Sequence, residues 1–292
     1  MTTTASIDPM SSPDPAPEAQ VAAIEASGLV RRTPSGEGLM TWHSFGRGRP
    51  LVLLHGGMGS WMHWMRNIAR LATTHRLLVP DIPGHLDSAL PAGPYTPDSV
   101  AAVLSDGIAT LIGSDASYAL AGFSFGSVIA GHLARHDARR VDRLVLVSPS
   151  GTGLARGAGG EVRKWRHLVD PAERLAVHRG NLMASMIADP THVDDLAVYI
   201  HAFSTERAKP VSAPISLGDT MRACLPQVTA PLAAIWGAQD PVSAPFMAER
   251  RAFFKAIQAD VRLEVIDGAS HWVQYEAAPA FDALLLDLCA AR

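Results

Sequence analysis

The chain has 292 residues, of which 48% are hydrophobic and 18% are charged, and its formal net charge is −3. This composition indicates a globular protein with a sizeable core, built as one large domain or as one domain with an insertion, and it excludes fibrous and disordered classes. The small net charge and the lack of a basic run argue against a nucleic-acid partner.

The two cysteines, Cys224 and Cys289, are far apart in the chain and lack the spacing of metal ligands. The sequence therefore predicts neither a disulfide framework nor a zinc site, and it fits a reducing compartment. No apolar stretch has the length of a membrane span, and residues 1–20 lack the basic start and apolar segment of a signal peptide. We expect a cytoplasmic protein with no membrane partner and a flexible tail over residues 1–20.

Apolar runs that end in tight turns recur along the chain. The first candidate strand lies around residues 39–45, and residues 51–54 are apolar throughout, as expected of a strand buried on both faces. Further candidate strands follow at residues 77–79, 118–120, 143–147, 231–236 and 261–266. Helical patterns fill the intervals, with Thr96-Pro97 as a typical helix start. Strands that alternate with helices favour an α/β fold with a mostly parallel sheet covered on both faces.

Residues 150–226 interrupt this alternation. They contain helical patterns, for example over residues 196–203, and no convincing strand. We therefore expect a core formed by residues 21–149 and 227–292, and a helical cap over residues 150–226 that covers the strand ends.

The segment Gly122-Phe123-Ser124-Phe125-Gly126 lies between a candidate strand and a helical run. In that context Gly-x-Ser-x-Gly is typical of a nucleophile elbow, a strained turn that exposes the serine oxygen. By itself the motif also fits an ordinary turn with a helix-capping serine. Ser124 is thus a candidate nucleophile, and the N–H of Phe125 at the helix start is a candidate donor to an oxyanion.

A serine nucleophile needs a base to take its proton and an acid to orient that base. Ligands gather at the carboxyl ends of parallel strands, so the candidates are sought in the turns that follow strands. His271 follows the last candidate strand, and Asp240 follows the strand before it. Asp267, in the same loop as His271, is the alternative acid, and we favour Asp240.

The turn His55-Gly56-Gly57-Met58 follows the apolar run at residues 51–54. A tetrahedral intermediate needs a second backbone N–H aimed at its negative oxygen. We predict Gly57 for this role beside Phe125, with Met58 as the alternative to Gly57. His55 is interpreted as structural.

Together these motifs resemble the α/β-hydrolase fold in its cap-bearing, single-domain group. The resemblance spans residue 39 to the C-terminus and depends on His55-Gly56-Gly57, Asp81-x-Pro83-Gly84, Gly122-x-Ser124-x-Gly126, Gly237-x-x-Asp240 and His271-Trp272. It implies an eight-stranded, mostly parallel sheet flanked by helices, with a helical cap after strand six. It also implies a Ser124–His271–Asp240 triad and neither a metal nor an organic cofactor.

Serine at the elbow separates the chain from haloalkane dehalogenases and epoxide hydrolases, which resemble it but carry a carboxylate there. Two reactions remain: hydrolysis of a carboxylic ester, and hydrolysis of a carbon–carbon bond in meta-cleavage products. His271-Trp272 and the cap segment resemble the carbon–carbon hydrolases, whereas Phe123 replaces their asparagine and the cap near Tyr199 lacks their arginine. We expect an ester hydrolase that acts through an acyl-enzyme.

The side chains Phe123, Phe125, Met58, Trp61 and Trp272 suggest an apolar pocket and hence a small, largely apolar substrate. A cofactor-independent dioxygenase or lyase on the same scaffold is an alternative, because fold does not fix function. A non-catalytic small-molecule receptor is the alternative from a different class.

Overall fold

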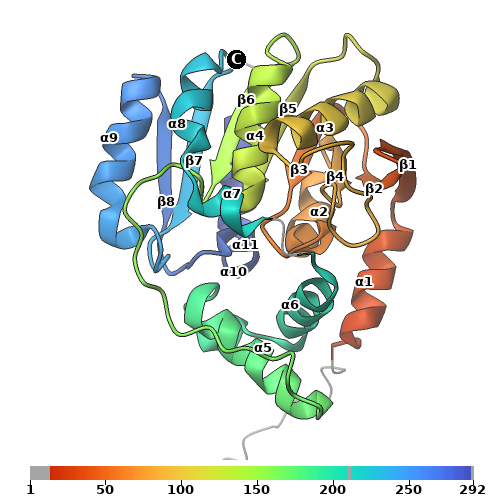
Figure 1. Ribbon diagram of the computed structural model, residues 1–292, viewed down its shortest axis with the longest axis vertical. Helices are drawn as coiled ribbons and strands as arrows, with labels where there is room; N and C mark the ends of the chain where they lie inside the picture. Colours follow the sequence, from red (N-terminus) through yellow and green to blue (C-terminus); the bar gives the residue numbers. More distant parts are fainter. Residues whose placement is uncertain (1–13, 210–211, 291–292) are drawn as a thin grey trace, which may run out of the picture.

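One eight-stranded sheet forms the centre of the computed structural model, which describes residues 14–209 and 212–290 (Figure 1). Its strands are β1 (Leu29–Ser35), β2 (Gly38–Phe45), β3 (Arg49–Leu54), β4 (His75–Pro80), β5 (Tyr118–Phe123), β6 (Val141–Val147), β7 (Leu232–Gly237) and β8 (Arg262–Ile266). They are ordered β1-β2-β4-β3-β5-β6-β7-β8. Strand β2 pairs antiparallel with β1 and β4, and all other neighbours are parallel. The predicted mostly parallel, eight-stranded sheet is therefore confirmed.

Helices cover both faces of the sheet (Figure 1). One face packs against α2 (Met65–Leu71) and α11 (Ala278–Cys289), and the other packs against α3 (Pro97–Ile112), α4 (Phe125–His136) and α9 (Met247–Ile257). Two short elements lie near the strand ends, η1 (Trp61–Trp64) and α10 (Val273–Glu276). Among the described residues, no helix combines the length and the apolar character that crossing a membrane requires.

The central strand β5 shows why its sequence is apolar throughout. Ala119, Ala121 and Phe123 belong to one hydrophobic core, and Tyr118 and Leu120 belong to the core on the opposite face of the sheet. Successive side chains of a strand point to opposite faces, so a strand with a core on each side has no position for a solvent-facing residue.

The N-terminal region differs from its prediction in two ways. Residues 1–13 of the predicted tail lie outside the described residues, but residues 17–20 form the first turn of helix α1 (Pro17–Ala26) and are not tail. Strand β1 was not predicted, because only Thr33 and Ser35 of its seven residues are buried. An edge strand of this kind carries no apolar pattern in its sequence.

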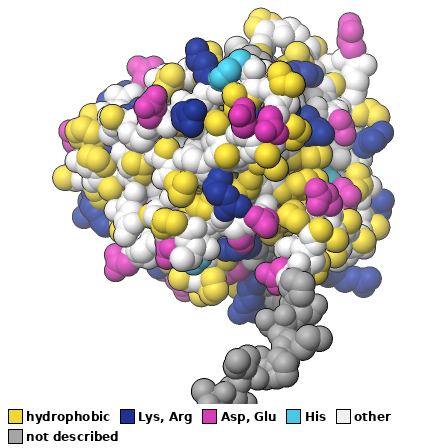
Figure 2. Space-filling model, turned by 90° about the horizontal axis from the view of Figure 1, so that it is seen from below, with side chains coloured by type: hydrophobic (Ala, Val, Ile, Leu, Met, Phe, Trp, Pro, Cys, Tyr) yellow, Lys and Arg dark blue, Asp and Glu magenta, His cyan; other side chains and the backbone are white. Residues whose placement is uncertain are grey.

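The described part of the region between β6 and β7 contains helices and no strand, although residues 149–170 form no helix. It contains α5 (Pro171–Ser185), η2 (Pro190–His192), α6 (Asp195–Arg207), α7 (Ala213–Leu217) and α8 (Thr220–Cys224). In Figure 1, α5 and α6 lie below the sheet, whereas α8 returns to the core, where Met221 packs against Gly131 of α4. Figure 2 views the molecule from the cap side and shows basic, acidic and hydrophobic side chains interspersed on that face.

Candidate active site

The turn between β5 and α4 holds Ser124 in a strained conformation, with φ 51° and ψ −113°. Its flanking glycines are required by close backbone contacts. A β-carbon on Gly122 would lie 2.3 Å from the Gly126 carbonyl oxygen, and one on Gly126 would lie 2.4 Å from the His55 carbonyl oxygen. Ser124 makes no capping hydrogen bond to α4, so the alternative of an ordinary turn with a capping serine is wrong.

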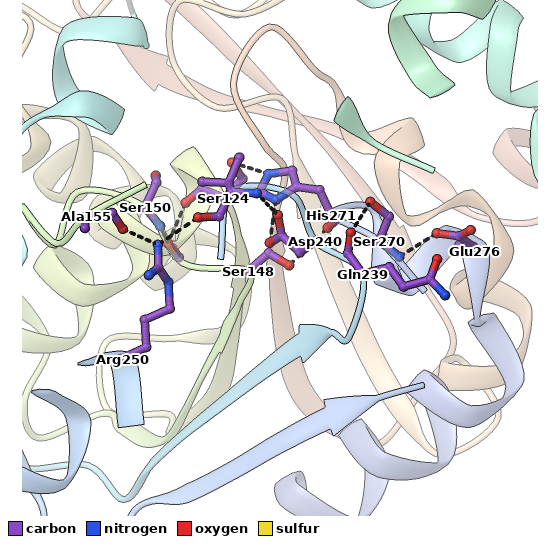
Figure 3. Close-up of polar contacts among 12 residues, drawn as sticks. Ser124, Ser148, Ser150, Ala155, Gln239, Asp240, Arg250, Ser270, His271 and Glu276 are labelled. Atoms are coloured by element: carbon purple, nitrogen blue, oxygen red, sulfur yellow. Dashed lines mark hydrogen bonds and ion pairs between the residues drawn. The ribbon is translucent and has the colours of Figure 1, made fainter. Parts of the chain in front are cut away.

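His271 lies between Ser124 and Asp240 (Figure 3). Its Nε2 is 3.0 Å from Ser124 Oγ, and its Nδ1 is 3.0 Å from Asp240 Oδ2. When Nδ1 carries its proton toward the carboxylate, Nε2 is free to accept the proton of the hydroxyl. The three side chains, 31 and 147 residues apart along the chain, thus have the geometry that proton transfer requires.

The Asp240 carboxylate is fully buried and is kept charged by its neighbours. Burial raises the pKa of Asp240. The charge of the nearby His271 and the hydrogen bonds with His271, the Val242 N–H and Ser243 lower this pKa by more than burial raises it, so the net pKa is below its usual value. The buried Arg250 of α9 fixes this turn by donating hydrogen bonds to the carbonyl oxygens of Val242 and Ala155 (Figure 3). An ionised carboxylate is the form that can orient a histidine.

Asp267, the alternative acid, is exposed at the end of β8, and no hydrogen bond to His271 is found for it among the residues that the structure describes. The structure therefore brings Asp240 to the histidine and leaves Asp267 apart.

The backbones of Gly57 and Phe125 lie side by side. A β-carbon built on Gly57 would be 3.4 Å from the β-carbon of Phe125. The backbone N–H groups of Gly57, Met58 and Phe125 have no acceptor within the described residues. Backbone N–H groups that lack an acceptor, one directly after Ser124 and others in the neighbouring turn, could donate hydrogen bonds to the negative oxygen of a tetrahedral intermediate. His55 uses both ring nitrogens, donating to the Gly56 carbonyl oxygen and accepting from the Ile82 N–H, which fits its structural interpretation.

His63, in η1, is a residue of this site that the sequence reasoning missed. Its Nδ1 accepts a hydrogen bond from the Gly56 N–H at 3.2 Å, so it holds the turn that presents Gly57. Burial and the nearby His201, His271 and His85 lower the pKa of His63 to about 3. The ring is therefore neutral, with its remaining proton on Nε2.

Glu276 was also missed. Its Oε2 accepts a hydrogen bond of 2.6 Å from the N–H of Ser270, the residue before His271 (Figure 3). Its Oε1 accepts hydrogen bonds of 2.8 Å from the N–H groups of Ala188 and Asp189, in the cap. This buried carboxylate thus joins the loop of His271 to the cap, and no motif in the sequence indicates it.

The predicted apolar pocket is wrong for most of its members. Phe123, Phe125, Trp61 and Trp272 are at most 4% exposed and belong to the cores, whereas Met58 is 45% exposed and lines a cavity. Phe123 still contributes to the site, because its ring lies 5.2 Å from that of His271 and supports it.

Both cysteines are buried and unpaired. Within residues 14–209 and 212–290, no group of three or more His, Cys, Asp or Glu residues is placed so that it could hold a metal ion.

Comparison with known proteins places these features in a family. The family model described as "Alpha/beta hydrolase family" matches residues 51–284, most of the chain. The dihydrolipoyllysine-residue acetyltransferase component of the acetoin cleaving system of Pseudomonas putida is 28% identical over 280 residues, which cover 92% of this chain and 71% of that protein. The 2-hydroxy-6-oxo-6-phenylhexa-2,4-dienoate hydrolase of Burkholderia cepacia is 25% identical over 262 residues, with coverage of 84% and 89%.

Among solved structures, the esterase RhEst1 from Rhodococcus sp. ECU1013 is similar in fold. It superposes with a TM-score of 0.73 at 21% identity, covering 89% of this chain and 98% of that chain.

Proposed function

Because the chain belongs to the α/β-hydrolase family, we propose that it is a serine hydrolase that cleaves a carboxylic ester through an acyl-enzyme. The observation that carries this proposal is the pair of 3.0 Å contacts that His271 makes with Ser124 and Asp240. Esterases and a meta-cleavage product hydrolase both stand among the structural neighbours, so the choice of an ester depends on the sequence, in which Phe123 stands where the carbon–carbon hydrolases carry asparagine.

In the proposed mechanism, Ser124 Oγ attacks the ester carbonyl carbon while His271 Nε2 takes its proton. Asp240 stabilises the resulting imidazolium, and the N–H groups of Gly57 and Phe125 bind the negative oxygen. Collapse of the tetrahedral intermediate breaks the bond to the alkoxy group, which leaves as the alcohol with the proton from Nε2. Water then gives a proton to Nε2 as it attacks the carbonyl carbon of the acyl-enzyme, and collapse of this second intermediate breaks the bond to Ser124 Oγ, which takes the proton back from Nε2 as the acid leaves.

Labelling with a fluorophosphonate and turnover of a short p-nitrophenyl ester test the nucleophile. We expect Ser124→Ala to abolish labelling and to lower kcat by about 10³-fold or more. The exposed Ser114→Ala is the matched control and should leave both unchanged. Turnover that survives in Ser124→Ala at the wild-type rate would exclude an acyl-enzyme on this serine.

The choice of acid has its own test. Asp240→Asn should lower the acylation rate by about 10⁴-fold, as expected when the base loses the partner that sets its tautomer. Asp267→Asn should have little effect, since Asp267 is exposed and apart from His271. A larger loss of rate in Asp267→Asn than in Asp240→Asn would identify Asp267 as the acid that orients His271.

Hydrolysis of a carbon–carbon bond is the second candidate, favoured by the similarity to the Burkholderia cepacia hydrolase. A 2-hydroxy-6-oxo-dienoate cleaved much faster than any ester would establish this alternative. Binding of both substrate types without turnover of either would indicate the non-catalytic receptor.

A further inference from the structure

A cavity of about 290 Å³ lies between the turn of Gly57 and the cap. Its wall comprises Met58 of that turn, Asn181 of α5, His201 and Thr205 of α6, and the segment at residues 162–166. Met58 directly follows Gly57, and consecutive Cα atoms are only about 3.8 Å apart. The cavity therefore borders the place where a substrate carbonyl would meet the proposed oxyanion donors.

The histidines give a second link between this cavity and the proposed catalytic site. After burial, the neighbours that lower the pKa of His63 are led by His201 of the cavity wall and His271 of the relay. His63 thus lies near both, and its ring is 5.5 Å from that of Phe123, which is itself 5.2 Å from the ring of His271.

The cavity wall is basic. Arg163, Lys164 and Arg166 are all exposed, and none of them forms an ion pair within the part of the chain that the structure describes. The Arg166 guanidinium lies over the ring of Trp165, 4.7 Å from its centroid, which leaves its N–H groups free for a ligand. Three unpaired cations on one short segment create a positive potential over the cavity.

Other charged groups nearby do not cancel this potential. Exposed acids flank the segment on both sides, Glu161 before it and Asp170 after it, and Asp170 already accepts the hydrogen bond of the Ala172 N–H at the start of α5, so a net positive charge remains. The nearest acid of α6, Glu206, is already engaged by Arg174 at 3.6 Å and His178 at 3.3 Å. His201 adds no charge, because burial and the neighbouring His178 lower its pKa to about 3.

The basic segment is held at a fixed backbone position. The buried side chain of Asn181 accepts a hydrogen bond of 2.8 Å from the Arg163 N–H and donates one of 3.0 Å to the Arg163 carbonyl oxygen. The Gly160 N–H also donates to the Ala184 carbonyl oxygen at 2.8 Å. This two-point attachment to α5 fixes the backbone of the segment beside the cavity, so binding need not order the main chain.

We propose that the basic cavity, formed by residues 162–166 with Met58, Asn181 and His201, binds an anionic group of the substrate, a carboxylate or a phosphate. The inference rests on the proposed function and names its substrate class: an ester with an apolar chain that ends in an anion. Met58, Val162 and Trp165 contact the chain, and the guanidinium groups donate charge-assisted hydrogen bonds to the anion.

Matched esters test the substrate class. Mono-p-nitrophenyl glutarate and suberate carry a terminal carboxylate, and p-nitrophenyl pentanoate and octanoate are their neutral counterparts of equal length. We expect kcat/KM to be at least about tenfold higher for the anionic member of one pair, chiefly through KM. The preference should shrink as ionic strength rises, because partly exposed charges are screened by salt.

The triple variant Arg163→Gln/Lys164→Gln/Arg166→Gln should bring the anionic-to-neutral ratio close to one, and Lys164→Gln alone should give an intermediate ratio. The control Arg31→Gln/Arg32→Gln/Arg139→Gln removes the same charge from exposed positions outside the cavity and should keep the wild-type ratio. Equal kcat/KM within both ester pairs, or a preference that survives in the triple variant, would overturn the proposal.

Calorimetric titration with hexanoate, hexyl phosphate and hexanol separates this inference from the proposed function. Binding of either anion to the wild type, at least about tenfold tighter than hexanol and lost in the triple variant, supports the cavity even when no ester is turned over. The tighter of the two anions identifies the head group. Anions that bind no better than hexanol would refute the site while leaving ester hydrolysis intact.

Discussion

Glu276→Gln is the sharpest test of how the proposed base is held. The carboxylate accepts three backbone hydrogen bonds, one from Ser270 and two from Ala188 and Asp189 of the cap. A glutamine is almost the same size, but only one of its two terminal atoms can accept. Whichever way the amide is turned, its NH₂ group faces either the buried N–H of Ser270 or the partly buried N–H groups of Ala188 and Asp189.

The cost follows from that donor–donor contact. Leaving a buried donor unsatisfied costs about 1–3 kcal/mol, and the remaining hydrogen bonds lose the charge that strengthened them. We expect the free energy of unfolding to fall by about 3 kcal/mol. With an unfolding entropy of about 2.1 cal/mol/K per residue, this lowers Tm by about 5 °C.

The kinetic effect should exceed the loss of stability. Repulsion at Ser270, or at the two cap N–H groups that fix the side chain, displaces the loop that carries His271, and a displacement of about 1 Å in a catalytic group costs about 10²-fold in rate. We expect kcat for a short ester at 25 °C to fall 10- to 100-fold with little change in KM. This split indicates a positioning role, because the protein stays folded at that temperature.

Two controls separate positioning from simple destabilisation. Leu285→Ala opens a cavity in the buried face of α11 and should lower Tm by a similar amount while leaving kcat unchanged. Glu37→Gln removes one charge from an exposed turn and should change neither quantity. A Glu276→Gln enzyme with wild-type kcat and a lowered Tm would refute the reasoning, since Glu276 would then serve stability alone.

Three further predictions concern stability. Burial raises the pKa of Asp282 to about 7 from 3.8, so the native state binds this proton more tightly than the unfolded state. The free energy of unfolding therefore falls as pH rises from about 4 to about 7, by at most about 4 kcal/mol. Calorimetry at pH 8.5 should find a higher Tm for Asp282→Asn than for the wild type. The low pKa of His201, about 3, acts in the opposite sense: its contribution is complete above pH 6.5 and is lost as pH falls, so His201→Gln should flatten the decline of Tm between pH 6 and pH 4. Gly126→Ala should lower stability by about 3 kcal/mol or prevent folding, because its β-carbon would meet backbone, whereas Gly180→Ala in α5 meets nothing within 4 Å and should be neutral or stabilising in denaturant titrations.

The parts of the fold that could be predicted are those whose cause is local. A strand such as β5, with a core on each face, must be apolar at every position, and the sharp turn after it must have glycines where β-carbons would strike backbone. Such requirements produce sequence patterns that can be recognised within a few neighbouring residues. The relative order of Ser124, Asp240 and His271 then follows from the topology of the sheet.

The parts that could not be predicted depend on distant partners. Glu276 contacts Ala188, 88 residues away, and His63 supports a turn whose other contacts lie in the sheet. The aromatic residue Phe123 was expected in a pocket, but a side chain beside a nucleophile can point into the core as easily as toward a ligand, and only packing decides. The basic segment at residues 162–166 carries no periodicity that would place it over a cavity.

The two halves of the proposed relay are held by different parts of the molecule. The strained backbone of Ser124 costs about 1–3 kcal/mol, and the sheet maintains it, since the Ser124 N–H donates to the Val147 carbonyl oxygen of β6 at 2.8 Å. The loop of His271 is also tied to the core, since Ser148 Oγ donates to the His271 carbonyl oxygen at 3.0 Å, but it has two further links to the cap, through Glu276 and through the hydrogen bond from the Trp272 N–H to the Met186 carbonyl oxygen. A change in the cap should therefore affect the base more than the nucleophile. Substitutions at the cap contacts should accordingly reduce proton transfer from Ser124 before they disturb the elbow itself.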